Sequence, residues 1–142
     1  MTGRILALDL GEKRIGLAIS DPTGTIARPL ETINHVSGVI DAALIAQKAE
    51  DLKAVQIVVG IPVNPGENDN PKARHARKFA DLLQKQTSAE VVFWDESFST
   101  NQAQEIRRLM SVPKKSRQGH LDDLAAAIIL QSYLDSEGQK LP

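Results

Sequence analysis

The sequence predicts an α/β fold with one five-stranded mixed sheet and helices on both of its faces. The chain has 142 residues, a length that suits a single domain. Three strand-like segments come first, and after them the hydrophobic periodicity alternates between helix and strand. A meander of strands followed by such alternation gives a sheet with antiparallel and parallel pairs, packed between helices.

The first three strands form the meander. They are predicted from apolar and β-branched runs at residues 4–9, 15–20 and 25–33. Between the second and third runs, Pro22 presets one backbone angle of a turn and Gly24 permits a positive one. Pro29 places the third strand at an edge or a bend, because proline cannot donate to the strand ladder.

The next segment changes from strand to helix periodicity. Apolar residues at three- and four-residue spacing predict a helix with one buried stripe, made of Val36, Val39, Ile40, Ala43 and Leu44. Residues 55–60 are a fourth strand, and residues 61–70, with two prolines and three asparagines, are a loop. Asn70 then caps a second helix that has Pro71 at its first position. The apolar face of this helix is Ala76, Phe79, Ala80 and Leu83.

A fifth strand and two further helices complete the order. The strand is predicted at residues 90–94, and Ser99 or Thr100 caps a third helix. The apolar side of that helix is Ala103, Ile106 and Met110. A basic break at 113–119 precedes the last helix, at 121–134, which is apolar nearly all round and therefore largely buried.

Composition restricts the classes of function. With 17 basic and 18 acidic residues the net charge is −1, so any contact with nucleic acid must come from a local basic patch. The chain has no cysteine, which excludes thiol nucleophiles, disulfides and cysteine metal sites. The longest apolar run, Leu124–Leu130, is far shorter than the roughly 18 residues of a membrane helix. We expect a cytoplasmic protein with one domain, residues 1–135, and a tail at 136–142.

Carboxylates occur at three places where chemistry is plausible. Asp9 ends an apolar strand, where aspartate is rare unless it is paired, binds a metal or bonds to the following turn. Asp95-Glu96 follows the fifth strand and Asp122-Asp123 opens the last helix, and each pair alone is typical of solvated acids or helix-dipole partners. Together, one acid from each element could hold Mg²⁺ or Mn²⁺, which prefer oxygen ligands. Two such ions can activate water for phosphodiester cleavage.

Two basic clusters accompany these acids. One, at the start of the second helix, is Lys72, Arg74, His75, Arg77 and Lys78. The other, before the last helix, is Arg107, Arg108, Lys114, Lys115, Arg117 and His120. Either cluster alone is typical of a solvated face, but a basic segment leading to an acidic site suits a phosphate backbone. The large aromatics Trp94 and Tyr133 are interpreted as core residues rather than base-stacking platforms.

Four motifs follow one another along the chain. Residues 9–21 are DLGEKRIGLAISD, residues 58–62 are VVGIP, residues 95–100 are DESFST, and residues 121–134 are LDDLAAAIILQSYL. In this order and spacing the sequence resembles the YqgF/RuvX family, bacterial homologues of the Holliday-junction resolvase RuvC with an RNase H-like fold. The hairpin motif matches the family pattern DxGxxRIGxAxSD in full.

The resemblance implies a metal-dependent nuclease whose catalytic and metal-holding acids are Asp9, Glu96 and Asp122, with Mg²⁺ or Mn²⁺ as cofactor. The residues expected to contact the nucleic-acid backbone are Lys13, Arg14, Lys114, Lys115 and Arg117. One departure is Ser97, which stands where the family has an arginine and so removes a positive charge beside the expected metals. The substrate that the resemblance implies is the 5′ region of precursor 16S rRNA, in ribosome biogenesis.

Other functions stay open at this point. A Holliday-junction DNA endonuclease would use the same acids and act as a homodimer, whereas RNA trimming suits a monomer. A non-catalytic nucleic-acid binder is favoured by Ser97 and the near-neutral charge, but retention of three acids opposes it. A sugar-kinase or actin-like phosphate binder would need two related domains, for which the chain has no room. Dependence on divalent metal and on Asp9 separates these functions.

Overall fold

The structure is a computed structural model that describes residues 3–61, 71–95 and 114–139. The elements, in chain order, are β1 (Arg4–Leu10), β2 (Arg14–Ser20), β3 (Ala27–Asn34), α1 (Gly38–Asp51), β4 (Ala54–Ile61), α2 (Pro71–Gln84), β5 (Glu90–Asp95) and α4 (Lys114–Gln139). The helix predicted after residues 99–100 and most of the loop predicted at 61–70 lie outside the described residues. None of the helices described is long and apolar enough to cross a membrane.

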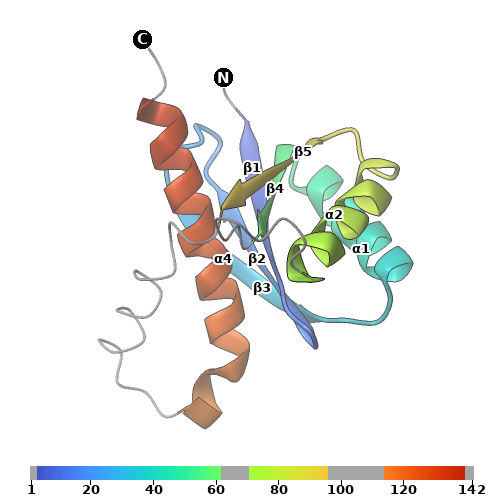
Figure 1. The fold of residues 1–142 in the computed structure, drawn as a ribbon. Coiled ribbons are helices and arrows are strands. Elements are labelled where there is room, and N and C mark those ends of the chain that lie inside the picture. Colours follow the sequence, from blue (N-terminus) through green and yellow to red (C-terminus); the bar gives the residue numbers. More distant parts are fainter. Residues whose placement is uncertain (1–2, 62–70, 96–113, 140–142) are drawn as a thin grey trace.

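The sheet has five strands in the order β3-β2-β1-β4-β5. Strand β1 pairs antiparallel with β2 and parallel with β4, β2 pairs antiparallel with β3, and β4 pairs parallel with β5. Helices α1 and α2 cover one face and α4 crosses the other (Figure 1). The predicted five-stranded mixed sheet between helices is therefore confirmed.

Strand β1 divides its side chains between two cores. Leu6 and Leu8 belong to the cluster under α1 and α2. Ile5 and Ala7 belong to the cluster under α4. Because successive side chains of a strand point to opposite faces, Asp9 continues the second set and its carboxylate lies on the α4 face.

The buried face of α1 differs from the predicted one. Val39 and Ile40 are 59% and 53% exposed, so the predicted stripe faces solvent. The residues that the helix buries are Asp41, Ala42, Ile45, Ala46 and Ala49. Two stripes with helical spacing exist on this helix, and the one rich in alanine packs inward because small side chains let the helix approach its neighbours closely.

Helix α2 agrees with its prediction, and α4 begins earlier than predicted. Helix α2 starts at Pro71, and all four predicted apolar positions are buried. Helix α4 already starts at Lys114, so the predicted basic break at 113–119 is wrong from residue 114 onward. Gly119 lowers helix propensity by only about 1 kcal/mol, which a long helix tolerates. The helix continues to Gln139 and so includes residues 136–139 of the expected tail.

Polar side chains hold α4 against the sheet. The side-chain oxygen of Gln131 accepts the Ala27 N–H at 2.9 Å, and its amide nitrogen donates to the Thr25 carbonyl at 3.0 Å. The Tyr133 hydroxyl donates to Oε1 of Gln56 at 3.0 Å. These three bonds join the second half of α4 to the sheet and to the turn before β3, so they help to fix the position of the helix along the sheet.

The two large aromatics lie in the core, as predicted. The rings of Trp94 and Tyr133 are T-shaped, with centroids 5.5 Å apart; Tyr133 belongs to the cluster under α4, and the partly buried Trp94 packs against it. The indole N–H of Trp94 donates to Oγ of Ser132 at 3.1 Å, which satisfies its polar atom within the protein.

The turn between β2 and β3 is held by Asp21. Its Oδ1 accepts the N–H groups of Thr25 and Ile26 at 2.8 and 3.0 Å, and its Oδ2 accepts the Thr23 hydroxyl. The Ile26 N–H, the Thr23 hydroxyl and the Thr25 N–H together hold the pKa of the Asp21 carboxyl well below its usual range. Gly24 has φ +71°, as the turn prediction required.

Candidate functional site

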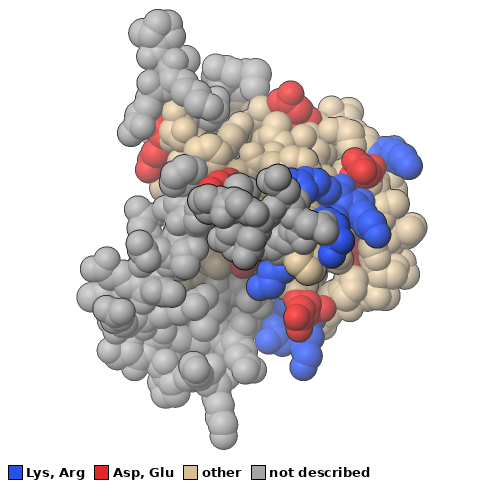
Figure 2. All heavy atoms as spheres, viewed as in Figure 1, with Lys and Arg blue, Asp and Glu red and all other residues tan. Residues whose placement is uncertain are grey.

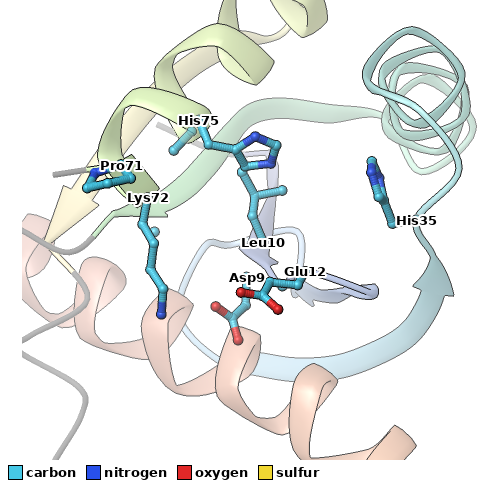
Figure 3. A pocket seen from close by; sticks show the side chains of 10 residues that line it. Asp9, Leu10, Glu12, His35, Pro71, Lys72 and His75 are labelled. Carbon is cyan, nitrogen blue, oxygen red and sulfur yellow. The ribbon is translucent and has the colours of Figure 1, made fainter.

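A pocket of about 530 Å³ opens where β1 and β4 end and α2 begins (Figure 3). The side chains and backbone that line it include Asp9, Glu12, His35, Gly60, Lys72 and His75. The carboxyl ends of parallel strands meet at one edge of a sheet, and in α/β folds ligands bind in the crevice beyond that edge. The topology therefore brings an acidic strand end and a basic helix start to one hollow.

Asp9 stands between two glycines on the sheet. It pairs with Gly16 of β2. On the other side Leu8 pairs with Val59, so Gly60 of β4 is the next position along. Residues opposite one another in a sheet share a face, so neither neighbouring strand places a side chain beside the Asp9 carboxylate. The two neighbouring strands therefore do not crowd this carboxylate, and Asp9 is one of the residues that line the pocket.

The backbone of Asp122 lies at the level of Asp9. Tyr133 bonds to Gln56, which pairs with Ile5, so this part of α4 is level with the start of β1. Figure 1 shows α4 running opposite to β1. From Tyr133 back to Asp122 a helix covers roughly 16 Å. From Ile5 to Asp9 a strand covers roughly 13 Å. The two predicted acids thus come from elements that meet at one level, although the side chain of Asp122 is not among those described.

The fifth strand ends in an acid, Asp95, at the same edge of the sheet. Asp95 ends β5 and pairs with Ile61, the last residue of β4. Trp94 points into the core under α4, so Asp95 points to the opposite face of the sheet. Glu96, the predicted site residue, lies outside the described residues. Within the described part of the chain, no three His, Asp or Glu side chains are grouped closely enough to hold a metal ion.

The basic cluster of α2 forms one exposed helix face. Its members, all exposed, are Lys72, Arg74, His75, Arg77 and Lys78, while alanines and Phe79 form the buried side. Figure 2 shows Lys and Arg side chains gathered over α2 and over the turn between β1 and β2. Lys72 and His75 line the pocket. This cluster, which on sequence alone could be a solvated face, therefore borders the candidate site.

The predicted backbone-contacting residues come from two places. Lys13 lies in the turn from β1 to β2, next to the pocket residue Glu12, and Arg14 is the first residue of β2. Lys114, Lys115 and Arg117 belong to the first turns of α4, and their side chains are not among those described.

The turn after Asp9 depends on Gly11. Its N–H donates to the Arg14 carbonyl at 2.9 Å. A Cβ at this position would lie 2.6 Å from the same carbonyl oxygen, closer than such atoms approach. Only glycine fits this turn, which carries Glu12 and Lys13 at the edge of the pocket.

Sequence reasoning did not place Glu12, His35, Lys72 or His75 in the site. For Lys72 and His75 a signal existed, because they lie three residues apart at the start of a helix that follows a parallel strand. For His35 no signal existed, because its place beside the pocket follows from how β3 and α1 are joined in space. Glu12 was treated only as part of a turn.

The comparisons agree with this fold. A family model described as "RuvX: Holliday junction resolvase" matches residues 3–136. A protein of Koribacter versatilis named "Putative pre-16S rRNA nuclease" is 38% identical over 136 residues, which are 96% of this chain and 89% of the relative. A protein of Syntrophus aciditrophicus with the same name is 39% identical over 140 residues, covering 98% and 93% of the two chains.

Solved structures with this fold include two kinds of resolvase. The chain is similar to Thermus thermophilus RuvC in complex with a Holliday junction substrate, with a TM-score of 0.64, 14% identity and 97% coverage of both chains. It is also similar to the fowlpox virus Holliday junction resolvase, with a TM-score of 0.53, 16% identity and coverage of 94% and 99%. At these identities the likeness concerns the fold, which is RNase H-like as the sequence predicted.

Proposed function

The chain belongs to the RuvX family, and we propose that it is a metal-dependent nuclease that hydrolyses phosphodiester bonds in precursor 16S rRNA during 5′-end processing. The observation that carries the proposal is the position of Asp9. Its carboxylate stands between two glycines at the sheet edge, in a pocket that Lys72 and His75 also line. An acidic centre beside a basic surface suits a substrate made of phosphates. The substrate itself is proposed from the relatives' name.

We propose Asp9, Glu96 and Asp122 as the residues that hold Mg²⁺ or Mn²⁺. The donor chemistry fits, because carboxylate oxygens are the ligands that these ions prefer. The neighbouring strands do not oppose this, since Gly16 and Gly60 place no side chain beside Asp9. When bound, such ions supply a water activated for attack and stabilise charge on the leaving oxygen.

The chain's own basic residues position the substrate in this proposal. Lys13, Arg14, Lys114, Lys115 and Arg117 bind phosphate oxygens of the backbone. Such contacts do not depend on base sequence, so they fix the strand against the acidic centre without selecting a sequence. Their positive charge also offsets the repulsion between the strand and the carboxylates. The family arginine replaced by Ser97 makes no contribution here, so these five residues supply the positive charge.

A branched-DNA endonuclease is the second candidate, because the description of the matching family model names a Holliday junction resolvase. The same acids would serve both substrates. A junction needs two symmetric cuts and hence a homodimer, whereas trimming an RNA end needs one site and suits a monomer. Processing of an rRNA precursor would place the protein in the cytoplasm.

Paired acidic substitutions test which carboxylates form the centre. Two neighbouring acids serve as controls, because Glu96 follows Asp95 and Asp122 precedes Asp123. We expect Glu96→Gln and Asp122→Asn to lower cleavage of a pre-16S 5′ fragment at least about a hundredfold. Asp95→Asn and Asp123→Asn should keep activity within about threefold. Equal losses within a pair would overturn the assignment of that acid.

A further inference from the structure

His35 is held in a fixed orientation beside the pocket. Its Nδ1 is hydrogen-bonded to Oδ2 of Asp41, a carboxylate that is only 1% exposed. The other oxygen of Asp41 accepts the Val36 N–H at 3.1 Å. The backbone N–H of His35 donates to the Lys13 carbonyl at 2.8 Å. The residue is therefore attached both to α1 and to the turn that follows Asp9.

The pairing with Asp41 determines which ring nitrogen remains for a ligand. A carboxylate accepts hydrogen bonds and does not donate, so Nδ1 of His35 carries the hydrogen. This leaves Nε2 for a partner outside the pair. His35 lines the pocket, and its side chain is 36% exposed, so this nitrogen can be reached from outside the protein.

The same pocket receives two further nitrogen donors from α2. Figure 3 shows the imidazole of His75 directed into the pocket on the side of His35, and Lys72 extending from the same helix toward Asp9. The acidic side chains at the pocket are Asp9 and Glu12, both from the end of β1 and its turn. The pocket thus has the two imidazoles on one side and, on the other, the carboxylates of Asp9 and Glu12 with Lys72 extending toward Asp9.

We propose that His35, positioned by Asp41, binds a backbone phosphate adjacent to the one cleaved, together with His75, while Lys72 contacts the strand on the Asp9 side of the pocket. The proposal rests on the proposed nuclease function for the identity of the ligand. In the imidazolium form both ring nitrogens donate, so one can remain on Asp41 while Nε2 donates to a phosphate oxygen. Charge-assisted hydrogen bonds of this kind are roughly twice as strong as neutral ones. The substrate strand would then pass between the two sides of the pocket and continue over α2.

A structural role for the pair makes a different prediction, and His35→Asn separates the two. The asparagine amide can replace Nδ1 and keep the hydrogen bond to Asp41, but it has no atom at the place of Nε2. If His35 only covers Asp41, this variant should keep both the urea midpoint and the affinity for the strand of wild type. If His35 binds phosphate, the variant should keep its urea midpoint and lose affinity for the strand.

The test is fluorescence anisotropy with a labelled single-stranded RNA in EDTA, which separates binding from cleavage. We expect His35→Asn and Lys72→Ala each to weaken binding about tenfold. Each should also reduce the slope of log K against log salt by about 0.7, the value for one phosphate contact on a single strand. Lys85→Ala, which removes an exposed charge beyond the far end of α2, should change affinity less than about twofold.

The outcomes distinguish this inference from the function on which it rests. Wild-type affinity and salt slope in His35→Asn would overturn the phosphate site, even if the protein cuts RNA normally. Binding that depends on His35 in a protein that cuts no nucleic acid would support the phosphate site and overturn only the nuclease function. Asp41→Asn should also weaken binding of the RNA in a protein that is still folded by urea unfolding, because the substitution frees the imidazole of His35 to turn.

Discussion

The Tyr133 hydroxyl donates a hydrogen bond of 3.0 Å to Oε1 of Gln56, and this contact fixes where α4 lies along the sheet. Gln56 pairs with Ile5 at the start of β1, so the opposite end of α4 comes level with Asp9. A shift of the helix by one turn would move it about 5.4 Å along the strand and separate Asp9 from the backbone of Asp122. One polar contact at the far end of the core thus contributes to the geometry of the acidic centre.

Tyr133→Phe should lower the free energy of unfolding by about 0.5–1.5 kcal/mol, because it removes the partly buried hydrogen bond to Gln56. Urea unfolding of this variant, Gln56→Ala and the double variant forms a cycle that isolates the pair. The double variant should lose less than the sum of the single losses. Strict additivity would mean that the two groups do not interact in solution.

Gly11→Ala should destabilise the turn after Asp9 by about 1–3 kcal/mol, because its Cβ would lie 2.6 Å from the Arg14 carbonyl oxygen. Cleavage should fall as well, since this turn carries Glu12 and Lys13. Gly38→Ala is the matched control. Its Cβ would meet only the flexible end of Leu82, at 3.0 Å, at the start of a helix. If urea unfolding showed Gly38→Ala to be less stable than Gly11→Ala, the steric argument would be contradicted.

The stabilising contribution of Asp21 should be lost in acid. Hydrogen bonds to the ionised carboxylate lower its pKa in the folded state, so its contribution is complete above the unfolded pKa of about 3.9. As the pH falls below about 4, the unfolded state takes up the proton first and the contribution is lost. The difference in stability between wild type and Asp21→Asn should therefore be larger at pH 7 than at pH 3. An equal difference at both values, measured by urea unfolding, would contradict this origin.

Lys78→Glu should weaken binding of single-stranded RNA at least about fivefold at low salt, because it reverses a charge on the exposed face of α2. Lys53→Glu is a control with the same change in net charge, because Lys53 is exposed and belongs to a separate hollow with Gly3 and Pro22. The control should bind within about twofold of wild type. Equal losses would show that overall charge, rather than this face, attracts the strand.

The parts of the fold that follow from local patterns could be predicted from the sequence. The strand that ends in Asp9 and the apolar face of α2 each have one dominant pattern, and the structure contains both. On α1 two apolar stripes compete, and only the packing against the sheet and α2 selects the alanine-rich one. The start of α4 at Lys114 was missed because a helix turn made of basic residues has no apolar periodicity.

The site divides in the same way. Asp9 was found because an aspartate in an apolar strand conflicts with its surroundings. That Gly16 and Gly60 lie beside Asp9 could not be predicted from the sequence, because it follows from the register of the strands. His35, the residue after β3, is held beside the pocket by its contact with Asp41 of α1. The local sequence of neither segment predicts this contact.

The central claim is that Asp9 belongs to a metal-dependent centre that cuts phosphodiester bonds. The most direct test offers wild type and Asp9→Asn a pre-16S 5′ fragment and a four-way DNA junction, with Mg²⁺, Mn²⁺ or EDTA. We predict cleavage of the RNA by wild type with either metal, and its loss by at least about a hundredfold in Asp9→Asn or EDTA. Cleavage of the junction but not of the RNA would show that the substrate is branched DNA. Equal binding by both proteins with no cleavage of either substrate would contradict the claim and leave a non-catalytic nucleic-acid binder.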